Sequence, residues 1–347
     1  MALPLSLFRR QSVLSCPPVS PGKQPQDEPV ERPCARTFGP VPSRRFGQSL
    51  GLNTIPPKTC TYSCVYCQVG RTNHLTTKRK SFCDPGELYA DVRAAVEHLQ
   101  HHGQKVDYLT FVPDGEPTLD SGLGRQLELV APLGIPRAVI SNASLIFRED
   151  VRGDLAKADR VSVKIDAVRH DAWRRIDRPH GDLRLEEILD GVLQFAREYQ
   201  GELDTETMLV EGMNDSTDDL LPLATFLGLV SPRRAYLSVP IRPPAEEGIV
   251  GPDETGLVQA FQILSSSVEH VEVIAGFEGN SFASTGDVRA DLLSITAVHP
   301  MRVDQVEALL QRSNATWDVV EWLIRQERLR EVEYGGHRFI VRRFCHR

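Results

Sequence analysis

The 347-residue sequence lacks any apolar run that approaches the ~18 consecutive residues needed to span a bilayer. It also lacks an internal repeat and a sustained coiled-coil register. Its seven cysteines are an odd number, and a chain of this length can bury a core without covalent cross-links, so a disulfide framework is not expected. The sequence therefore predicts a globular protein in a reducing compartment, with one large or two unequal domains and no membrane contact.

Positive charge is also in short supply. The chain has 40 Lys and Arg against 47 Asp and Glu, which gives a formal charge of −7 and a pI near 5.8. Nucleic-acid-binding proteins usually carry a basic excess, so non-specific binding by the whole molecule is not expected. A local basic face remains compatible with an acidic total.

Residues 1–36 differ from the rest of the chain. They contain seven prolines and no sustained hydrophobic periodicity, which is typical of a segment that cannot bury enough apolar surface to fold. The segment before Cys16 has some likeness to a lipoprotein cleavage site, but Arg9 and Arg10 interrupt the apolar run that a signal peptide needs. We predict a disordered Pro-rich tail over 1–36 and a cytoplasmic protein.

The most informative feature is a group of three cysteines, Cys60, Cys64 and Cys67, in the spacing C-x3-C-x2-C. An iron–sulfur cluster normally takes four cysteines, so a four-iron cluster held here would keep one iron without a protein ligand. That iron could accept an amino and a carboxylate group from a small molecule. Zinc remains an alternative, although the candidates for a fourth ligand, His74 and Cys83, are not at the usual spacing.

From residue 49 onward, β-rich runs alternate with amphipathic helical patterns. Strands are predicted near 49–55, 107–112, 137–141, 160–165, 204–210 and 235–240, with a further short strand open at 271–275. Helices are predicted near 85–102, 119–131, 148–158, 185–199 and 216–229, and helix-start signals stand at Pro85 and Ser216. The alternation predicts an α/β fold with a parallel sheet, and six units are too few for a complete eight-stranded barrel.

Polar residues follow several of these strands. Gly115-Glu116-Pro117 comes after the second strand, where a glycine allows a close backbone approach and a proline can open the next helix. Ser141 and Asn142 end the third strand. Loops at this end of a parallel barrel build the active site. Each of these signals is also ordinary turn chemistry when it stands alone.

The fourth strand alternates strictly. Val161, Val163 and Ile165 would share the face under the helices, which turns Lys164 and Asp166 toward the barrel interior. A buried lysine beside a carboxylate is either an internal ion pair or a functional group. The functional interpretations are a clamp for a cofactor's carboxylate or ribose and a contact to substrate.

These motifs resemble the radical S-adenosylmethionine (SAM) superfamily. Together with segments 38–47 and 173–180, they resemble in particular a subgroup related to the iron–sulfur enzyme of wybutosine synthesis on tRNA, over about residues 38–284. The resemblance implies a partial, six-strand (β/α) barrel of TIM-barrel type over 37–285. It also implies a [4Fe-4S] cluster on the three cysteines, with SAM completing the fourth iron. Asp114 departs from the family's Gly-Gly-Glu-Pro motif.

The resemblance further implies an activity and a cofactor site. Reduction of the cluster would cleave SAM, and the resulting 5′-deoxyadenosyl radical would abstract hydrogen from an unidentified substrate, for which tRNA is a candidate. A one-electron reductant such as flavodoxin or ferredoxin would be a partner. The cofactor-binding candidates are Tyr66, Gly115, Glu116, Pro117, Ser141, Asn142, Lys164 and Asp166.

Residues 286–347 follow a different pattern, with three helical segments and then two strands around Gly335-Gly336. This order resembles a small winged-helix module. Seven arginines and three acidic residues from position 325 onward leave a local charge of +4, which suits contact with nucleic acid or protein. The alternative function is therefore a zinc- or cluster-bearing winged-helix regulator that binds nucleic acid.

Overall fold

The computed structural model describes residues 36–275, 282 and 287–343, and these residues belong to one compact unit, Cys34–Arg347. The tail predicted over 1–36 lies outside the described residues except for its last residue, as do Cys16, Cys34 and Cys345. Within the described residues, no helix is both long enough and apolar enough to cross a bilayer.

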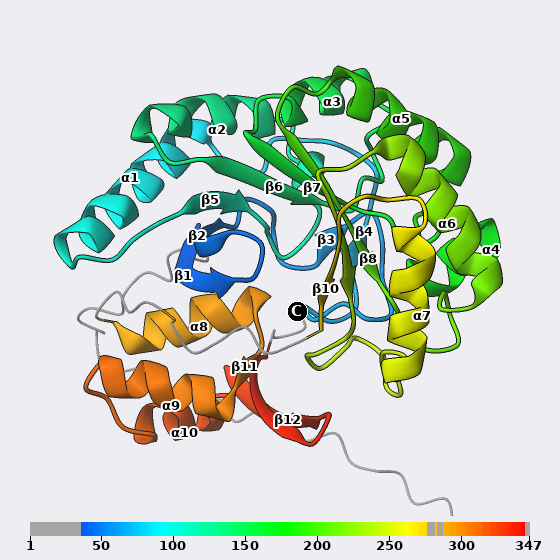
Figure 1. Cartoon of the computed structure of the whole chain (residues 1–347). Helices are drawn as coiled ribbons and strands as arrows, with labels where there is room; N and C mark the ends of the chain where they lie inside the picture. Colours follow the sequence, from blue (N-terminus) through cyan, green and yellow to red (C-terminus); the bar gives the residue numbers. More distant parts are fainter. Residues whose placement is uncertain (1–35, 276–281, 283–286, 344–347) are drawn as a thin grey trace, which may run out of the picture. The chain divides into compact units, whose positions relative to one another are not determined.

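A curved sheet of eight strands forms the centre of the unit (Figure 1). Its strands lie in the order β1 (Thr37–Ser43), β2 (Gly47–Leu52), β5 (Tyr108–Phe111), β6 (Arg137–Ser141), β7 (Arg160–Lys164), β8 (Glu202–Met208), β9 (Arg234–Ser238) and β10 (Val271–Ile274). β1 is antiparallel to β2, and the other neighbouring pairs in this sheet are parallel. The six predicted strands are present, β10 is the further short strand, and β1 was not predicted.

Helices connect the parallel strands and cover the outer face of the sheet (Figure 1). They are α1 (Pro85–His101), α2 (Leu123–Val130), α3 (Glu149–Leu155), α4 (His170–Ile176), α5 (Leu185–Glu198), α6 (Thr217–Val230) and α7 (Glu254–Ser265). Parallel strands need such crossovers, which is why strand and helix alternate along the chain. The predicted partial (β/α) barrel is confirmed, while α4 and α7 were not predicted.

The predicted helix starts are confirmed by side-chain caps. Asp84 precedes α1 and accepts hydrogen bonds from the amides of Gly86 and Glu87, both at 2.9 Å. Ser216 precedes α6 and accepts one from the amide of Asp219 at 3.2 Å. Each cap satisfies amides that have no partner within the helix.

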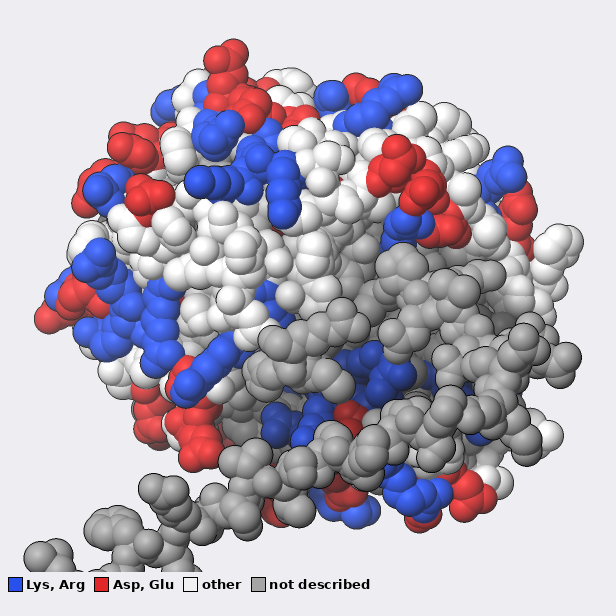
Figure 2. Space-filling view, turned by 180° about the vertical axis from the view of Figure 1, so that it is seen from behind, with Lys and Arg blue, Asp and Glu red and all other residues white. Residues whose placement is uncertain are grey.

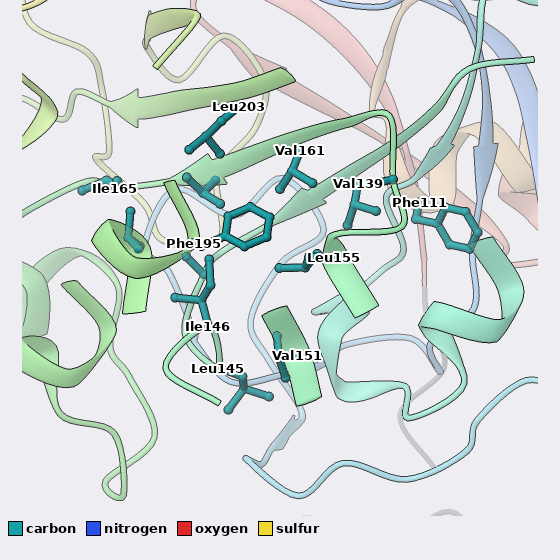
Figure 3. Packing of buried hydrophobic residues seen from close by; sticks show 14 of the residues in the cluster. Phe111, Val139, Leu145, Ile146, Val151, Leu155, Val161, Ile165, Phe195 and Leu203 are labelled. Atoms are coloured by element: carbon teal, nitrogen blue, oxygen red, sulfur yellow. The ribbon is translucent and has the colours of Figure 1, made fainter. Parts of the chain in front are cut away.

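The core between sheet and helices uses the predicted face of β7. Val161, Val163 and Ile165 are buried in one hydrophobic cluster with Phe195 of α5 (Figure 3). Burial of each such side chain stabilises the fold by roughly 1.5–3 kcal/mol. Strand alternation then places Lys164 on the opposite face, inside the barrel.

The C-terminal residues form a second, smaller sheet with three helices. The elements are α8 (Val288–Val298), β11 (Met301–Arg302), α9 (Val303–Arg312), α10 (Asp318–Arg325), β12 (Leu329–Tyr334) and β13 (His337–Arg342). The strands lie in the order β11-β13-β12. Gly335 and Gly336 make the turn between β12 and β13 with φ of 56° and 73°, values that favour glycine.

The C-terminal elements share a hydrophobic core with the barrel's edge strand. Phe38 and Val41 of β1 are buried in one cluster with Leu292 of α8, Leu309 of α9 and Leu323 of α10. The barrel and the C-terminal elements therefore pack through common apolar contacts.

Candidate functional site

The three motif cysteines lie on the loop between β2 and α1. Cys60 ends the two-residue strand β3 (Thr59–Cys60), which pairs with β4 (His74–Leu75). Cys64 and Cys67 follow in a turn, where the Cys67 amide donates to the Cys64 carbonyl at 3.2 Å. All three are half-buried free thiols. Because the loop follows the carboxyl end of β2, it lies at the end of the barrel where active sites are built.

The segment at the end of α4 holds the cysteine loop by backbone hydrogen bonds. The amide of Val65 donates to the carbonyl of Ile176, and the amide of His180 donates to the carbonyl of Thr61, both at 2.9 Å. Segment 173–180, singled out from the sequence, is therefore a direct support of the cysteine loop.

The turn after β5 supports the loop from another side. The amide of Lys58 donates to the carbonyl of Asp114 at 2.9 Å, and the amide of Glu116 donates to the carbonyl of Thr59 at 3.2 Å. A Cβ at Gly115 would lie 1.8 Å from the Thr59 oxygen. Glycine is thus required because the two backbones touch here.

Glu116 joins this turn to the end of β6. Its carboxylate accepts hydrogen bonds from the hydroxyls of Thr118 and Ser141, both at 2.7 Å, and from the amide of Asn142 at 2.8 Å. Burial raises the pKa of the Glu116 carboxyl, and these donors oppose the shift. The 3₁₀ turn η1 (Pro117–Leu119) begins directly after it. The Glu116 carboxylate is therefore bound by other groups of the protein. The backbone groups of this turn remain candidates for cofactor binding.

Asn142 reaches from β6 to the cysteine loop. Its amide nitrogen donates to Thr61 Oγ1 at 2.8 Å and to Cys60 Sγ at 3.5 Å. The hydroxyl of Ser144 donates to the same Thr61 oxygen at 2.6 Å. A hydrogen bond to a cysteine sulfur is one of the factors that set the reduction potential of an iron–sulfur cluster.

Tyr66, Lys164 and Asp166 lie together inside the barrel. Lys164 Nζ lies 3.5 Å from Glu206 Oε1, 3.9 Å from Asp166 Oδ1 and 4.8 Å from the centre of the Tyr66 ring. The Tyr66 hydroxyl donates to Asp166. Burial opposes the charge of Lys164, but Asp166 and Glu206 raise its pKa overall. The lysine is therefore a fixed cation beside the cysteine loop.

Asp177 is a site residue that sequence reasoning missed. Its Oδ1 accepts a hydrogen bond from Cys64 Sγ at 3.4 Å and lies at the same distance from the Tyr66 hydroxyl. Burial and the adjacent Asp166 raise the pKa of Asp177 well above its usual value. Asp177 falls within segment 173–180, but the sequence alone does not show which cysteine it faces.

The chemistry of the thiols fits an iron–sulfur cluster. Burial raises the pKa of Cys60 to about 12, and it also raises the pKa of Cys64 and Cys67. Thiolates at these positions need positive charge close by, which bound iron supplies. Three soft sulfur donors on one loop thus suit a cluster with one iron left open to a small molecule.

The zinc alternative requires a compact set of ligands around one ion. Of the candidates for a fourth ligand, His74 is exposed, whereas Cys83 is buried in the barrel core. In the described part of the chain, no three His, Cys, Asp or Glu side chains form a group that could hold a single metal ion. A four-iron cluster is larger than one ion and takes ligands that stand further apart.

The chain is similar to several known proteins. A family model described as the Radical SAM superfamily matches residues 54–224. The UPF0026 protein of Methanocaldococcus jannaschii is 42% identical over 307 residues, which cover 88% of this chain and 95% of the relative. The UPF0026 protein of Synechocystis is 36% identical over 208 residues, which cover 59% and 76%. Among solved structures, TYW1 with a lysine-pyruvate adduct bound aligns at 18% identity and a TM-score of 0.49, over 63% of this chain and 74% of that chain.

The cysteine loop, the partial barrel and the matching family model define a radical SAM superfamily enzyme. Within that class, the chain belongs to the UPF0026 family, because its Methanocaldococcus relative aligns over most of both chains. Membership implies a [4Fe-4S] cluster and SAM as cofactors.

Proposed function

We propose that this enzyme holds a [4Fe-4S] cluster on Cys60, Cys64 and Cys67, cleaves SAM reductively and abstracts hydrogen from a substrate. The observation that carries the proposal is three half-buried thiols gathered on one loop at the mouth of the barrel. When bound, the cluster and SAM supply an electron and a 5′-deoxyadenosyl radical. A one-electron reductant such as flavodoxin or ferredoxin is the proposed partner.

The chain's own residues position this chemistry. Asn142 donates a hydrogen bond to Cys60 Sγ and thereby fixes the orientation of this ligand. Lys164 is the proposed clamp for the carboxylate or ribose of SAM, since it is a fixed cation beside the cysteine loop.

Replacing Lys164 with methionine should weaken SAM binding by about 10- to 100-fold, because a charge-assisted hydrogen bond contributes roughly 1.5–3 kcal/mol. Methionine keeps the apolar stem, so iron content should stay close to that of the wild type. Equilibrium binding of SAM to the reconstituted protein measures the effect. Lys105→Met is the matched control, because the Lys105 side chain is 80% exposed.

Two other results would contradict the clamp role. Unchanged SAM affinity in Lys164→Met would assign Lys164 to another role. Global unfolding would instead show a structural ion pair, since Asp166 and Glu206 would then lose their buried counter-ion.

The proposed function as a whole is tested with anaerobically purified, full-length protein. After reduction in the presence of SAM, 5′-deoxyadenosine and methionine should accumulate together, and the protein should contain iron and sulfide in equal amounts. Zinc at one equivalent, with no iron or sulfide, would support the alternative regulator instead. Anaerobic turnover with cell extract, followed by a search for newly modified molecules, would then identify the substrate.

We propose tRNA as the substrate. We also propose that the enzyme is related to the subgroup that contains the iron–sulfur enzyme of wybutosine synthesis. A cavity of about 230 Å³ supports the tRNA proposal, because basic side chains line it. They are Lys58 of the cysteine loop, Arg330 of β12, Arg342 of β13 and Arg343, which follows β13. Lysine and arginine side chains bind the phosphate groups of nucleic acids. We propose nucleic-acid contact for residues 286–347 on this basis, with a protein partner as the other outcome.

Replacing Arg330 and Arg343 together with glutamine should weaken tRNA binding and lower its salt dependence by about one unit of log–log slope per lost phosphate contact. Filter binding at several salt concentrations measures both quantities. Arg125→Gln, on the exposed surface of α2, is the control. Equal affinity and equal slope in the double variant would exclude this face as the tRNA contact.

A further inference from the structure

Gln68, which directly follows Cys67, connects the cysteine loop to the C-terminal elements. Its Nε2 donates a hydrogen bond to the carbonyl oxygen of Val298 at 2.8 Å. Val298 is the last residue of α8, a position where a carbonyl cannot bond to an amide of its own helix. The Gln68 side chain therefore binds the carboxyl end of α8.

The oxygen of the same side-chain amide binds the loop after β9. One guanidinium nitrogen of Arg242 in that loop donates to Gln68 Oε1 at 2.7 Å. The reverse orientation of the amide would bring its N–H groups against the guanidinium and its oxygen against the Val298 carbonyl. The two hydrogen bonds therefore fix one orientation of the Gln68 amide.

Val298 is itself anchored to the barrel. Its side chain is buried in the hydrophobic cluster that contains Phe38 and Val41 of β1 and Leu292 of α8. Close packing of this kind resists small displacements. The carbonyl that Gln68 binds is therefore held in a fixed position relative to the edge strand of the barrel.

The hairpin of β12 and β13 supports the cysteine loop by a second route. The hydroxyl of Tyr334, at the end of β12, lies 3.1 Å from the carbonyl oxygen of Pro240 and 3.0 Å from that of Ile249. Ile249 in turn is buried in a small apolar cluster with Val65 of the cysteine loop. The C-terminal elements thus contact the cysteine loop directly through Gln68 and also through the loop after β9.

Gln68 also lies in the walls of two cavities. One is the cavity of about 230 Å³ with the basic side chains described above, and the other, of about 220 Å³, lies inside the barrel beside Tyr66 and Lys164. In Figure 2, a hollow on the face seen from behind likewise shows more Lys and Arg than Asp and Glu. Gln68 is therefore adjacent both to the proposed tRNA contact and to the barrel interior.

We propose that Gln68 is a positioning residue through which the C-terminal elements hold Cys67 in place for the cluster. Groups that orient metal ligands affect both the affinity for the metal and its electronic properties. The inference rests on the proposed function, because Cys67 is a ligand of the proposed cluster. It gives residues 286–347 a role at the cluster in addition to contact with the substrate.

The first test uses the full-length protein without its cluster. Iodoacetamide alkylates free thiols, and tandem mass spectrometry gives the rates at Cys67 and Cys83 separately. Gln68→Met keeps the length of the side chain but deletes both hydrogen bonds, so local opening should raise the rate at Cys67 at least about tenfold. The rate at Cys83, which is buried in the barrel core, should stay unchanged.

Two results of this labelling would overturn the inference. One is an unchanged rate at Cys67 in Gln68→Met. The other is an equal rise at Cys67 and Cys83 in both Gln68→Met and Gln68→Ala, which would show global unfolding instead of local release. Gln200→Met is the matched control, because Gln200 is exposed and its side chain donates to the nearby Glu198 carbonyl.

The second test follows the reduced cluster by electron paramagnetic resonance in the absence of SAM. Gln68→Met should give shifted g values or fail to retain the cluster, because the position of one ligand changes, whereas Gln200→Met should match the wild type. An unchanged spectrum in Gln68→Met would overturn the inference. A wild-type protein that assembles no cluster would instead contradict the proposed function, and the labelling rates would still show whether Gln68 holds Cys67.

Discussion

Each of the variants Cys60→Ala, Cys64→Ala and Cys67→Ala should lose formation of 5′-deoxyadenosine, by at least about 100-fold. Changes to residues that merely orient metal ligands already cost 10- to 100-fold, and these changes remove a ligand itself. The cluster would keep two thiolates, and Cys83, the next cysteine along the chain, is buried in the barrel core. Iron, sulfide and 5′-deoxyadenosine measured on each variant would show the loss.

Cys83→Ala is the matched control for these variants. Cys83 is also a free thiol, but it is buried in the barrel core, and its Sγ lies 3.6 Å from the carbonyl oxygen of Asp84. Its removal should leave cleavage intact and cost about 1 kcal/mol of stability, as for a small cavity. Normal 5′-deoxyadenosine formation by any of the three motif variants would refute the ligand assignment, and loss of iron from Cys83→Ala would require a different cluster model.

The sequence predicted the repeating part of the fold because each βα unit carries its own local signals. The edge strand β1 (Thr37–Ser43) escaped prediction because it contains Gly39, Pro40 and Pro42, residues that are depleted in strands. Proline is tolerated at a sheet edge, where one side of the strand needs no ladder hydrogen bonds. The tertiary position of β1, next to α8, could not be read from the sequence.

Helix α7 was missed for a different reason. Ala260 and Leu264 are buried, but Val258 is 56% exposed and Phe261 is 38% exposed on the same helix. Apolar residues on both faces weaken the helical periodicity on which the prediction depends.

Some of the site residues were predicted from the sequence and others were not. Strand alternation placed Lys164 and Asp166 inside the barrel, and the motif spacing placed the three cysteines on one loop. Their partners Asp177, Glu206 and Arg45 were not predicted as site residues. Arg45 lies 161 residues from Glu206, and Asp177 lies 113 from Cys64, so only the folded barrel shows these contacts.

Gly115→Ala should disrupt the cysteine loop more than its small size suggests. The new Cβ would lie 1.8 Å from the Thr59 carbonyl oxygen, 2.9 Å from the Thr59 carbonyl carbon and 3.1 Å from Ile55 Cγ2. Two of these atoms belong to the backbone, so no side-chain rotation relieves the clash. The backbone must shift next to Cys60, and the Glu116 hydrogen bond to Thr59 must lengthen.

Overpacking of this kind costs about 1–3 kcal/mol of folding stability. We expect the Gly115→Ala protein to be less stable by that amount. We also expect it to retain little iron after reconstitution. Chemical denaturation and iron analysis measure the two effects. Gly153→Ala in α3 is the matched control, because a Cβ there meets no atom within 4 Å. Alanine is also the better helix former, so the control should keep its iron and gain up to about 1 kcal/mol. Full iron content in Gly115→Ala would mean that the turn after β5 does not fix the position of Cys60.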